Sequence, residues 1–235
     1  MTASRMIRWA AALALLPSVA LAVGDGHGPD HWMVTDVAAD DVLNVRAGPS
    51  ARSIKIGEFE PELDGLTNHG CIGYLSFDEF QAATEAEREA ARKRVWCFVG
   101  SKRYLGWVAG RFLVEGDRTE QSPDWLFDLS GSEWNVILLG GAEPKARAWV
   151  TFRSPDKLFG NAGCNQFNGT YRKTHDQITV EPLSTTRKAC PPAETETERL
   201  MLSAFEAATD ILAQDSMTAL LNADGTIVML LRRKD

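Results

Sequence analysis

The stretch that decides the fold of the C-terminal half is Gly163-Cys164-Asn165-Gln166-Phe167-Asn168-Gly169-Thr170-Tyr171. Glycine adopts backbone angles that other residues resist, so the glycines here allow a tight turn around Cys164 and Asn165. From Phe167 to Tyr171 the residues then predict a strand. A second cluster follows at Ser184-Thr185-Thr186-Arg187-Lys188-Ala189-Cys190-Pro191-Pro192. We therefore expect the rest of this half to be built around the two clusters.

Together the two clusters resemble the META domain, the family that includes the heat-shock protein HslJ. The family pattern, Gly-x-Cys-Asn-x-Phe-x-Gly followed by Thr-Arg-x-x-Cys, falls here on Gly163, Cys164, Asn165, Phe167, Gly169, Thr186, Arg187 and Cys190. The resemblance implies a compact, partly open antiparallel β-barrel with one helix. It also implies a role in heat shock and antibiotic tolerance or, as in other organisms, in secretion and virulence. The likeness of such barrels to secretion pilotins implies an apolar groove for a lipid or peptide tail.

A mainly β pattern continues through this second domain, which we place at residues 125–235. Strands are predicted at 134–139, 148–152, 178–180, 219–221 and 226–231. The last two flank Asn222-Ala223-Asp224-Gly225, a hairpin-type turn. Thr195-Glu196-Thr197-Glu198 has capping-box spacing, and apolar residues recur at helical spacing after it, which predicts one amphipathic helix to about Thr209.

Residues 32–115 resemble a bacterial SH3-like domain, which implies a small β-barrel. The resemblance rests on Leu43–Ser50, Ile54–Gly57, Val95–Val99 and Gly106–Leu113, and its motif residues are Asn44, Val45, Arg46, Gly48, Pro49, Trp96, Gly106, Trp107 and Val108. We expect Trp96 and Trp107 to lie on neighbouring strands and to bury apolar area across the small core of this barrel.

An insertion at about residues 58–94 distinguishes this copy of the SH3-like pattern. Ser76-Phe77-Asp78-Glu79 has capping-box spacing, and residues 80–94 contain neither glycine nor proline, so we expect one surface helix there. Phe77 and Phe80 are expected to hold that helix against the barrel. Polar residues 116–124 are interpreted as a linker between the two domains.

The first residues of the chain are typical of a secretory signal. Arg5 and Arg8 precede an apolar run from Trp9 to Leu16, and Ala20-Leu21-Ala22 provides the small residues of a cleavage site, so residues 1–22 are interpreted as a signal peptide. The run is short for a bilayer span and no cysteine follows the site, so we expect a periplasmic or secreted protein that is neither a lipoprotein nor an integral membrane protein. An uncleaved anchor is the alternative. Loss of two arginines changes the net charge from -7 to about -9, which argues against a nucleic-acid partner.

Four cysteines, Cys71, Cys97, Cys164 and Cys190, fall two in each half of the chain. In an oxidising compartment the favoured pairing is Cys71 with Cys97 and Cys164 with Cys190, whereas other pairings would connect the two domains. Each favoured bridge would stabilise the fold by about 3.5 kcal/mol in the chain-entropy model. A zinc site is disfavoured because there is no close Cys-x-x-Cys pair and the histidines are scattered. We expect neither a metal nor any other cofactor.

The sequence offers no set of nucleophile, base and oxyanion donor, so we expect no enzymatic activity. Asn165 is expected to bond backbone groups in its turn, and Arg187 to bond a carbonyl or carboxylate. The leading hypothesis is an exported envelope protein whose SH3-like module docks a META module that acts in stress tolerance or envelope maintenance by binding a peptide, glycan or lipid. Its partner would be a cell-wall or envelope protein or peptide, with a lipid or peptide in the META barrel as a further possibility. The alternatives are a thiol-dependent cell-wall hydrolase that uses Cys164 and a secreted inhibitor of a hydrolase.

Overall fold

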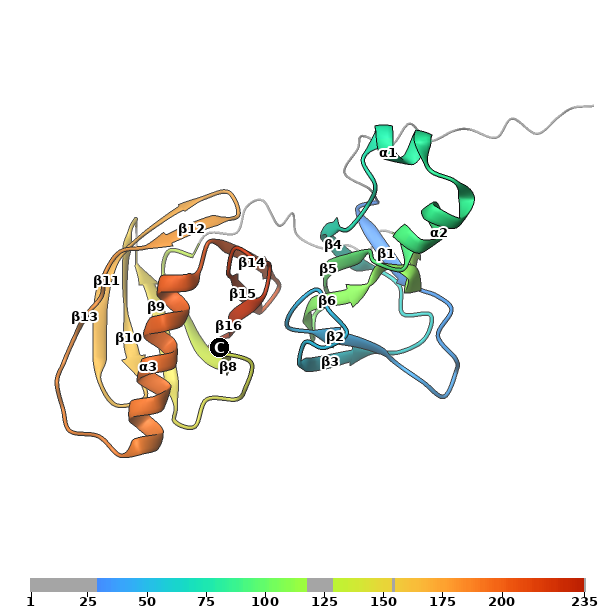
Figure 1. The fold of residues 1–235 in the computed structure, drawn as a ribbon. Coiled ribbons are helices and arrows are strands. Elements are labelled where there is room, and N and C mark those ends of the chain that lie inside the picture. The colour runs from blue at the N-terminus through green and yellow to red at the C-terminus, as the bar shows by residue number, and fades with distance from the viewer. Residues whose placement is uncertain (1–28, 118–128, 154, 235) are drawn as a thin grey trace, which may run out of the picture.

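The computed structural model describes residues 29–117, 129–153 and 155–234, so the expected signal peptide and most of the expected linker lie outside the described residues. The described chain is mainly β and forms an N-terminal module (residues 29–117) and a C-terminal module (residues 129–234) that lie side by side (Figure 1). None of the helices described has the length and apolar character needed to span a bilayer.

The N-terminal module is a seven-stranded open sheet in the order β3-β2-β6-β5-β4-β1-β7, which corrects the expectation of a small closed barrel, because β3 and β7 at its two edges do not pair. Its strands are β1 (His31–Val34), β2 (Leu43–Arg46), β3 (Lys55–Phe59), β4 (Leu66–Ile72), β5 (Trp96–Gly100), β6 (Leu105–Ala109) and β7 (Leu113–Glu115), with a 3-10 turn at Gly110–Phe112. β2 alternates buried Leu43 and Val45 with less buried polar residues, as a strand with one face on a core should. Gly106 is needed where β6 crosses β2, because a Cβ there would lie 2.8 Å from a Val45 methyl group.

The first disulfide joins β4, which lies within the predicted insertion at residues 58–94, to β5, which follows it. Cys71 on β4 lies directly opposite Cys97 on β5, and the two are bonded, as expected. The pairing of Ile72 with Trp96 fixes both ends of residues 73–95, so this segment leaves and re-enters the sheet at neighbouring positions.

Residues 73–95 form an arm that differs from the predicted single helix. It contains two short helices, α1 (Phe77–Ala82) and α2 (Glu85–Arg92). The expected capping box of Ser76 and Glu79 starts α1, and a second box, Thr84 with Glu87, starts α2 and so interrupts the helix. The prediction that Phe77 and Phe80 hold the arm against the sheet is wrong: they are 76% and 46% exposed, and Arg88 covers the Phe80 ring.

The C-terminal module is a closed barrel, which corrects the expectation of a partly open one. Its nine strands follow the order β10-β9-β8-β16-β15-β14-β12-β11-β13, and an additional pairing of β10 with β11 closes all but β13 into a ring. The strands are β8 (Ser132–Leu139), β9 (Ala148–Arg153), β10 (Lys157–Ala162), β11 (Gln166–Thr174), β12 (Gln177–Val180), β13 (Ser184–Thr185), β14 (Asp210–Gln214), β15 (Met217–Leu221) and β16 (Ile227–Arg233).

One long helix, α3 (Pro192–Ala207), packs against the barrel (Figure 1). Its buried Met201 and Phe205 join the barrel core, where Phe205 meets Phe167 of β11 at 5.6 Å between ring centroids. The predicted capping box at Thr195 is wrong, because Pro192 already starts the helix, at the first position, where its missing N–H costs nothing. The core is therefore filled by side chains from both the sheet and the helix.

A third apolar cluster, here called the junction, connects the two modules. The N-terminal module contributes Ala47, Phe98, Leu105 and Trp107, and the C-terminal module contributes Met217, Ala219, Leu221, Ile227 and Leu230. The indole Nε1 of Trp107 donates to the carbonyl oxygen of Gly225 at 2.6 Å, and the Ile227 amide donates to the Ala47 carbonyl at 2.7 Å. Trp107 thus packs in the junction, which corrects the expectation that it fills the N-terminal module's own core.

Candidate functional site

Asn165 is the centre of a hydrogen-bonded group that we call the Asn165 cluster: Gly163, Cys164, Asn165, Thr186, Lys188, Cys190 and Glu198. The Asn165 side chain is 6% exposed. Its Oδ1 accepts from Thr186 Oγ1 at 2.7 Å and from the Lys188 amide at 2.9 Å, while its Nδ2 donates to Glu198 Oε2 at 2.8 Å. One side chain therefore joins the turn before β11, the loop after β13 and helix α3.

The disulfide Cys164–Cys190 and Gly163 reinforce the same attachment. Gly163 has a φ of +105°, and a Cβ there would lie 3.0 Å from the Glu194 carbonyl oxygen, so both the turn and the approach to α3 call for glycine. Each part of the cluster thus fastens the β10–β11 turn to the start of α3. These hydrogen bonds engage both the oxygen and the nitrogen of the Asn165 side chain, so its role is to support the fold.

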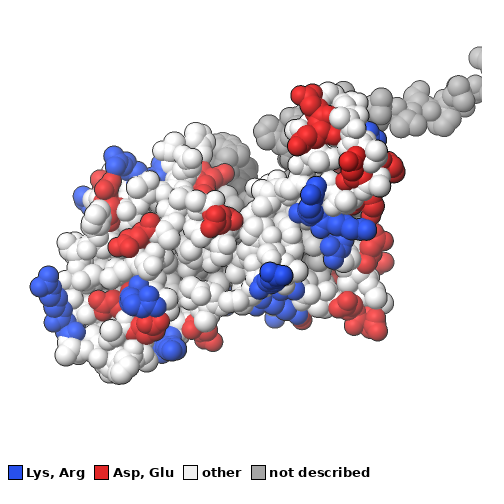
Figure 2. Space-filling model, in the orientation of Figure 1, with Lys and Arg blue, Asp and Glu red and all other residues white. Residues whose placement is uncertain are grey.

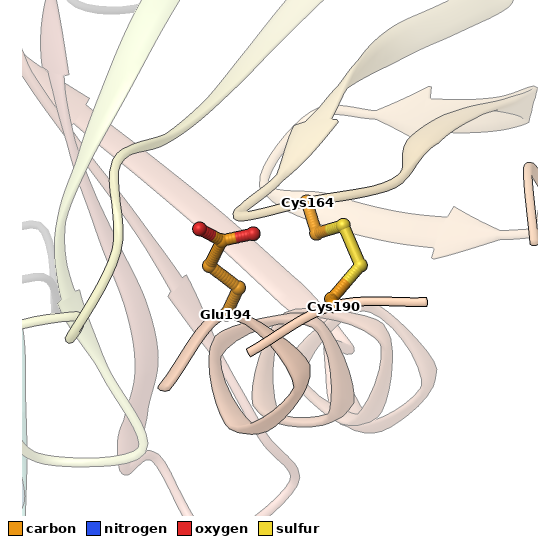
Figure 3. A group of neighbouring side chains, drawn as sticks. All are labelled: Cys164, Cys190 and Glu194. Carbon is orange, nitrogen blue, oxygen red and sulfur yellow. A yellow bond between two sulfur atoms is a disulfide. The ribbon is translucent and has the colours of Figure 1, made fainter. Parts of the chain in front are cut away.

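Glu194 lies beside the disulfide (Figure 3), and ligand atoms of Cys164, Cys190 and Glu194 are within 4.8 Å of one another. Cysteine binds metals as a thiolate, and both sulfur atoms here are bonded to each other. While the disulfide is intact, the group offers a metal one carboxylate and no thiolate.

Arg187 does not take the role expected for it. Its side chain is exposed and makes no hydrogen bond to any residue that the structure describes. The neighbouring Lys188 contributes instead, through its backbone amide. A backbone contact can be made by any residue except proline, so the residue type gave no indication of it.

A cavity of about 430 Å³ opens at the edge of the junction, between the two modules. One wall comes from β4, β5 and β6, and the other comes from β14, β15, the β15–β16 turn and the turn after β11. The lining residues include His69, Phe98, Trp107, Asp176, Asp210, Leu212, Leu221 and Asp224. The volume is in the range of about 300–1,000 Å³ that small-molecule sites occupy. Acidic side chains border the crevice on the C-terminal module (Figure 2).

His69 lines this cavity from the middle of β4. Its ring meets Phe98 edge to face, with 6.0 Å between centroids, and its buried Nε2 has no hydrogen-bond partner of good geometry among the described residues. Burial lowers the pKa of His69 to about 4, although the Gln214 side chain and the Asp176 carboxylate both act to raise it. At neutral pH the imidazole is therefore uncharged.

Residues 127–235 match the model of the META domain family. The C-terminal module is a META domain. No curated protein matches the chain significantly. The NMR structure of a protein from Burkholderia xenovorans is 20% identical, covers 50% of this chain and 95% of its own, and has a TM-score of 0.38. A DUF4847 family protein from Bacteroides vulgatus is 12% identical, covers 46% of this chain and 96% of its own, and has a TM-score of 0.34.

Within the META domain, the motif residues gather at one end of β11. Phe167 packs in the barrel core, and a Cβ at Gly169 would lie 2.5 Å from a Leu183 methyl group. Cys164, Asn165, Thr186 and Cys190 belong to the Asn165 cluster. The motif thus lies away from the junction, and none of its residues lines the cavity.

The SH3-like motif residues lie mostly on β2, β5 and β6. Trp107 is paired with Arg46 of β2 and with Phe98 of β5, and Val108 belongs to the core of the N-terminal module. Arg46 donates to the Ser53 carbonyl at 2.8 Å, and so supports the loop that contains Gly48 and Pro49. Of this motif, only Trp107 lines the cavity.

Reasoning from sequence missed the cavity residues, above all His69 and the three aspartates. The sequence of β15 contained a signal for the junction, because Met217, Ala219 and Leu221, which share one face of the strand, are all apolar. Leu220 on the opposite face is apolar too, and the structure buries every residue of the strand. An antiparallel strand with water on one side should alternate. The lack of alternation indicates that the META domain buries the outer face of β15 as well.

Proposed function

We propose that the protein is an exported, non-enzymatic binding protein of the cell envelope, and that its SH3-like module and META domain receive a ligand in the cavity between them. The observation that carries this proposal is the cavity itself, whose two walls come from different modules that share a buried apolar junction. Because the junction fixes one wall against the other, the shape of the site is set before a ligand arrives, which reduces the entropic cost of binding.

Export is supported by the two disulfides, one in each module, which indicate an oxidising compartment. The expected leader at residues 1–22 agrees with this location. We assign the protein to stress tolerance or envelope maintenance because of its META domain.

A binding role is favoured over the thiol-hydrolase alternative by the state of Cys164. Its sulfur is bonded to Cys190, and a thiol nucleophile must be a free thiolate. The Asn165 cluster also lies apart from the cavity, so the motif supports the fold while the junction supplies the space. The expected ligand classes are a peptide, glycan or lipid, held between the modules and not inside the filled barrel.

The test is retention of envelope components by the immobilised mature protein. Ala223 lies in the β15–β16 turn and lines the cavity, so Ala223→Trp should fill part of it. Ala86→Trp, on the exposed side of α2, adds the same side chain outside the cavity. We expect wild type and Ala86→Trp to retain the same peptide, glycan or lipid from sacculi and envelope extracts, and Ala223→Trp to lose it. Equal retention by both variants, or no retention by wild type at any salt concentration, would contradict the proposal.

A further inference from the structure

We propose that the cavity between the modules binds an alkylammonium group, such as a lysine side chain or a free aliphatic amine. This inference rests on the proposed use of the cavity as a ligand site and adds the chemistry of the ligand. It is drawn from three features of the lining: its charge, its apolar floor and its uncharged histidine.

The charge of the lining is negative. Asp176, Asp210 and Asp224 lie around the cavity, and no lysine or arginine is among the described residues that line it. None of these carboxylates forms an ion pair with a described residue; the Asp210 carboxylate accepts only from the adjacent Thr209 hydroxyl, at 2.7 Å. Carboxylates in a crevice with low-dielectric walls attract cations more strongly than those on an open surface.

The floor of the cavity is apolar and buried. Phe98 and Trp107 meet edge to face, with 5.2 Å between ring centroids, and Leu221 lies beside them. Their side chains are almost fully buried, whereas Asp176 and Asp224 at the rim are exposed. An alkylammonium group has an apolar part and a charged part that match this floor and rim. Its methylene stem packs on apolar surface, while its charged end stays near water and carboxylates.

His69 is the one basic side chain in the described lining. Because burial keeps its pKa near 4, the ring carries no charge at neutral pH and does not repel a cation. A protonated histidine at this position would oppose binding, so the low pKa favours the site. The volume of about 430 Å³ accommodates a chain the size of a lysine side chain.

The experiment is titration of the mature protein, followed by amide NMR at low salt, with four probes. Pentylamine represents a free amine and N-acetyl-Gly-Lys-Gly-amide a lysine side chain, while N-pentylacetamide and N-acetyl-Gly-Lys(acetyl)-Gly-amide match them with the ammonium group removed. We expect shifts around β14, β15 and β4 with at least one of the charged probes. Its acetylated counterpart should bind at least 10-fold more weakly, and 0.5 M salt should weaken binding of the charged form.

The variant for this test is Asp176→Asn with Asp210→Asn, which removes two charges and keeps the shape of both side chains. Asp40→Asn, at an exposed turn of the N-terminal module, is the matched control. Binding should fall at least 10-fold in the double variant and stay unchanged in the control, with thermal unfolding showing that all three proteins are folded. Binding by neither charged probe, equal binding of acetylated probes, or an unchanged affinity in the double variant would overturn the inference.

The two proposals can fail separately. If Ala223→Trp abolishes retention of an envelope ligand but no amine binds, the cavity is a ligand site and the alkylammonium inference is wrong. If the amines bind as expected but Ala223→Trp leaves envelope retention unchanged, the cation site stands and the proposed function is wrong.

Discussion

The Asn165 side chain bonds Thr186, Lys188, Cys190 and Glu198, and its bond to Glu198 requires an amide. Its Nδ2 donates to the Glu198 carboxylate at 2.8 Å, so Asn165→Asp would bring two carboxylates into contact in a buried position. We expect a loss of about 3 kcal/mol in the free energy of unfolding at pH 7, measured by urea denaturation. The loss should shrink near pH 4, where a protonated Asp can donate. Asn168→Asp, on the exposed side of β11, should cost less than about 0.5 kcal/mol; an equal loss in both variants would mean that the cluster is not the cause.

His69 makes stability depend on pH. Its pKa is lowered by burial to about 4, so between pH 6.5 and 4 the unfolded chain binds a proton that the folded chain does not. The contribution is complete above pH 6.5 and is lost as the pH falls, by up to about 1.4 kcal/mol per pH unit. Unfolding free energies measured from pH 7 to 4 should fall less steeply in His69→Gln than in wild type, while His31→Gln, outside the junction, should follow wild type. Parallel curves for His69→Gln and wild type would contradict the assignment.

At the scale of elements, the Cys164–Cys190 disulfide holds the β10–β11 turn to the start of α3. The two cysteines are 26 residues apart, as are Cys71 and Cys97. The chain-entropy model therefore gives about 3.5 kcal/mol for each bridge, so Cys164→Ala with Cys190→Ala and Cys71→Ala with Cys97→Ala should lose similar amounts in urea denaturation. A loss below about 1 kcal/mol for the first pair would show that the hydrogen bonds of Asn165 hold α3 in place without the disulfide.

The helices, strands and disulfides differ in how well the sequence predicted them. Strand β11, both disulfides and the start of α1 follow from local signals: glycine positions, cysteine spacing and Ser76 with Glu79. The start of α3 was predicted at the wrong residue, because the capping-box spacing at Thr195 and Glu198 was preferred to Pro192 as a helix-start signal. The exposure of Phe77 and the junction depend on which surfaces meet in three dimensions, and apolar residues alone do not specify their partners. The closure of the barrel depends on the pairing of β10 with β11, and the sequence predicted no strand at the position of β10.

At the scale of the whole molecule, we expect the junction to make the two modules one unfolding unit. Trp107 fills it and donates to Gly225, so Trp107→Ala should remove about 3–5 kcal/mol and separate the thermal unfolding of the modules. Differential scanning calorimetry should show one transition for wild type and two for Trp107→Ala. Trp107→Phe keeps one aromatic ring but loses the hydrogen bond and part of the buried area, so it should cost less than Trp107→Ala, about 1–2 kcal/mol, and keep a single transition. Two transitions in wild type would mean that the junction does not couple the modules.

The outer faces of β15 and β16 restrict how this META domain can be used apart from its neighbour. Met217, Ala219, Leu221, Ile227 and Leu230 are covered by the N-terminal module. A recombinant fragment that begins at residue 127 would present this stripe to water, and exposed apolar stripes on sheets promote self-association. Anyone producing the fragment alone would need polar substitutions along the stripe, and any gene fusion that gave the domain a new neighbour would have to supply a similar apolar cover.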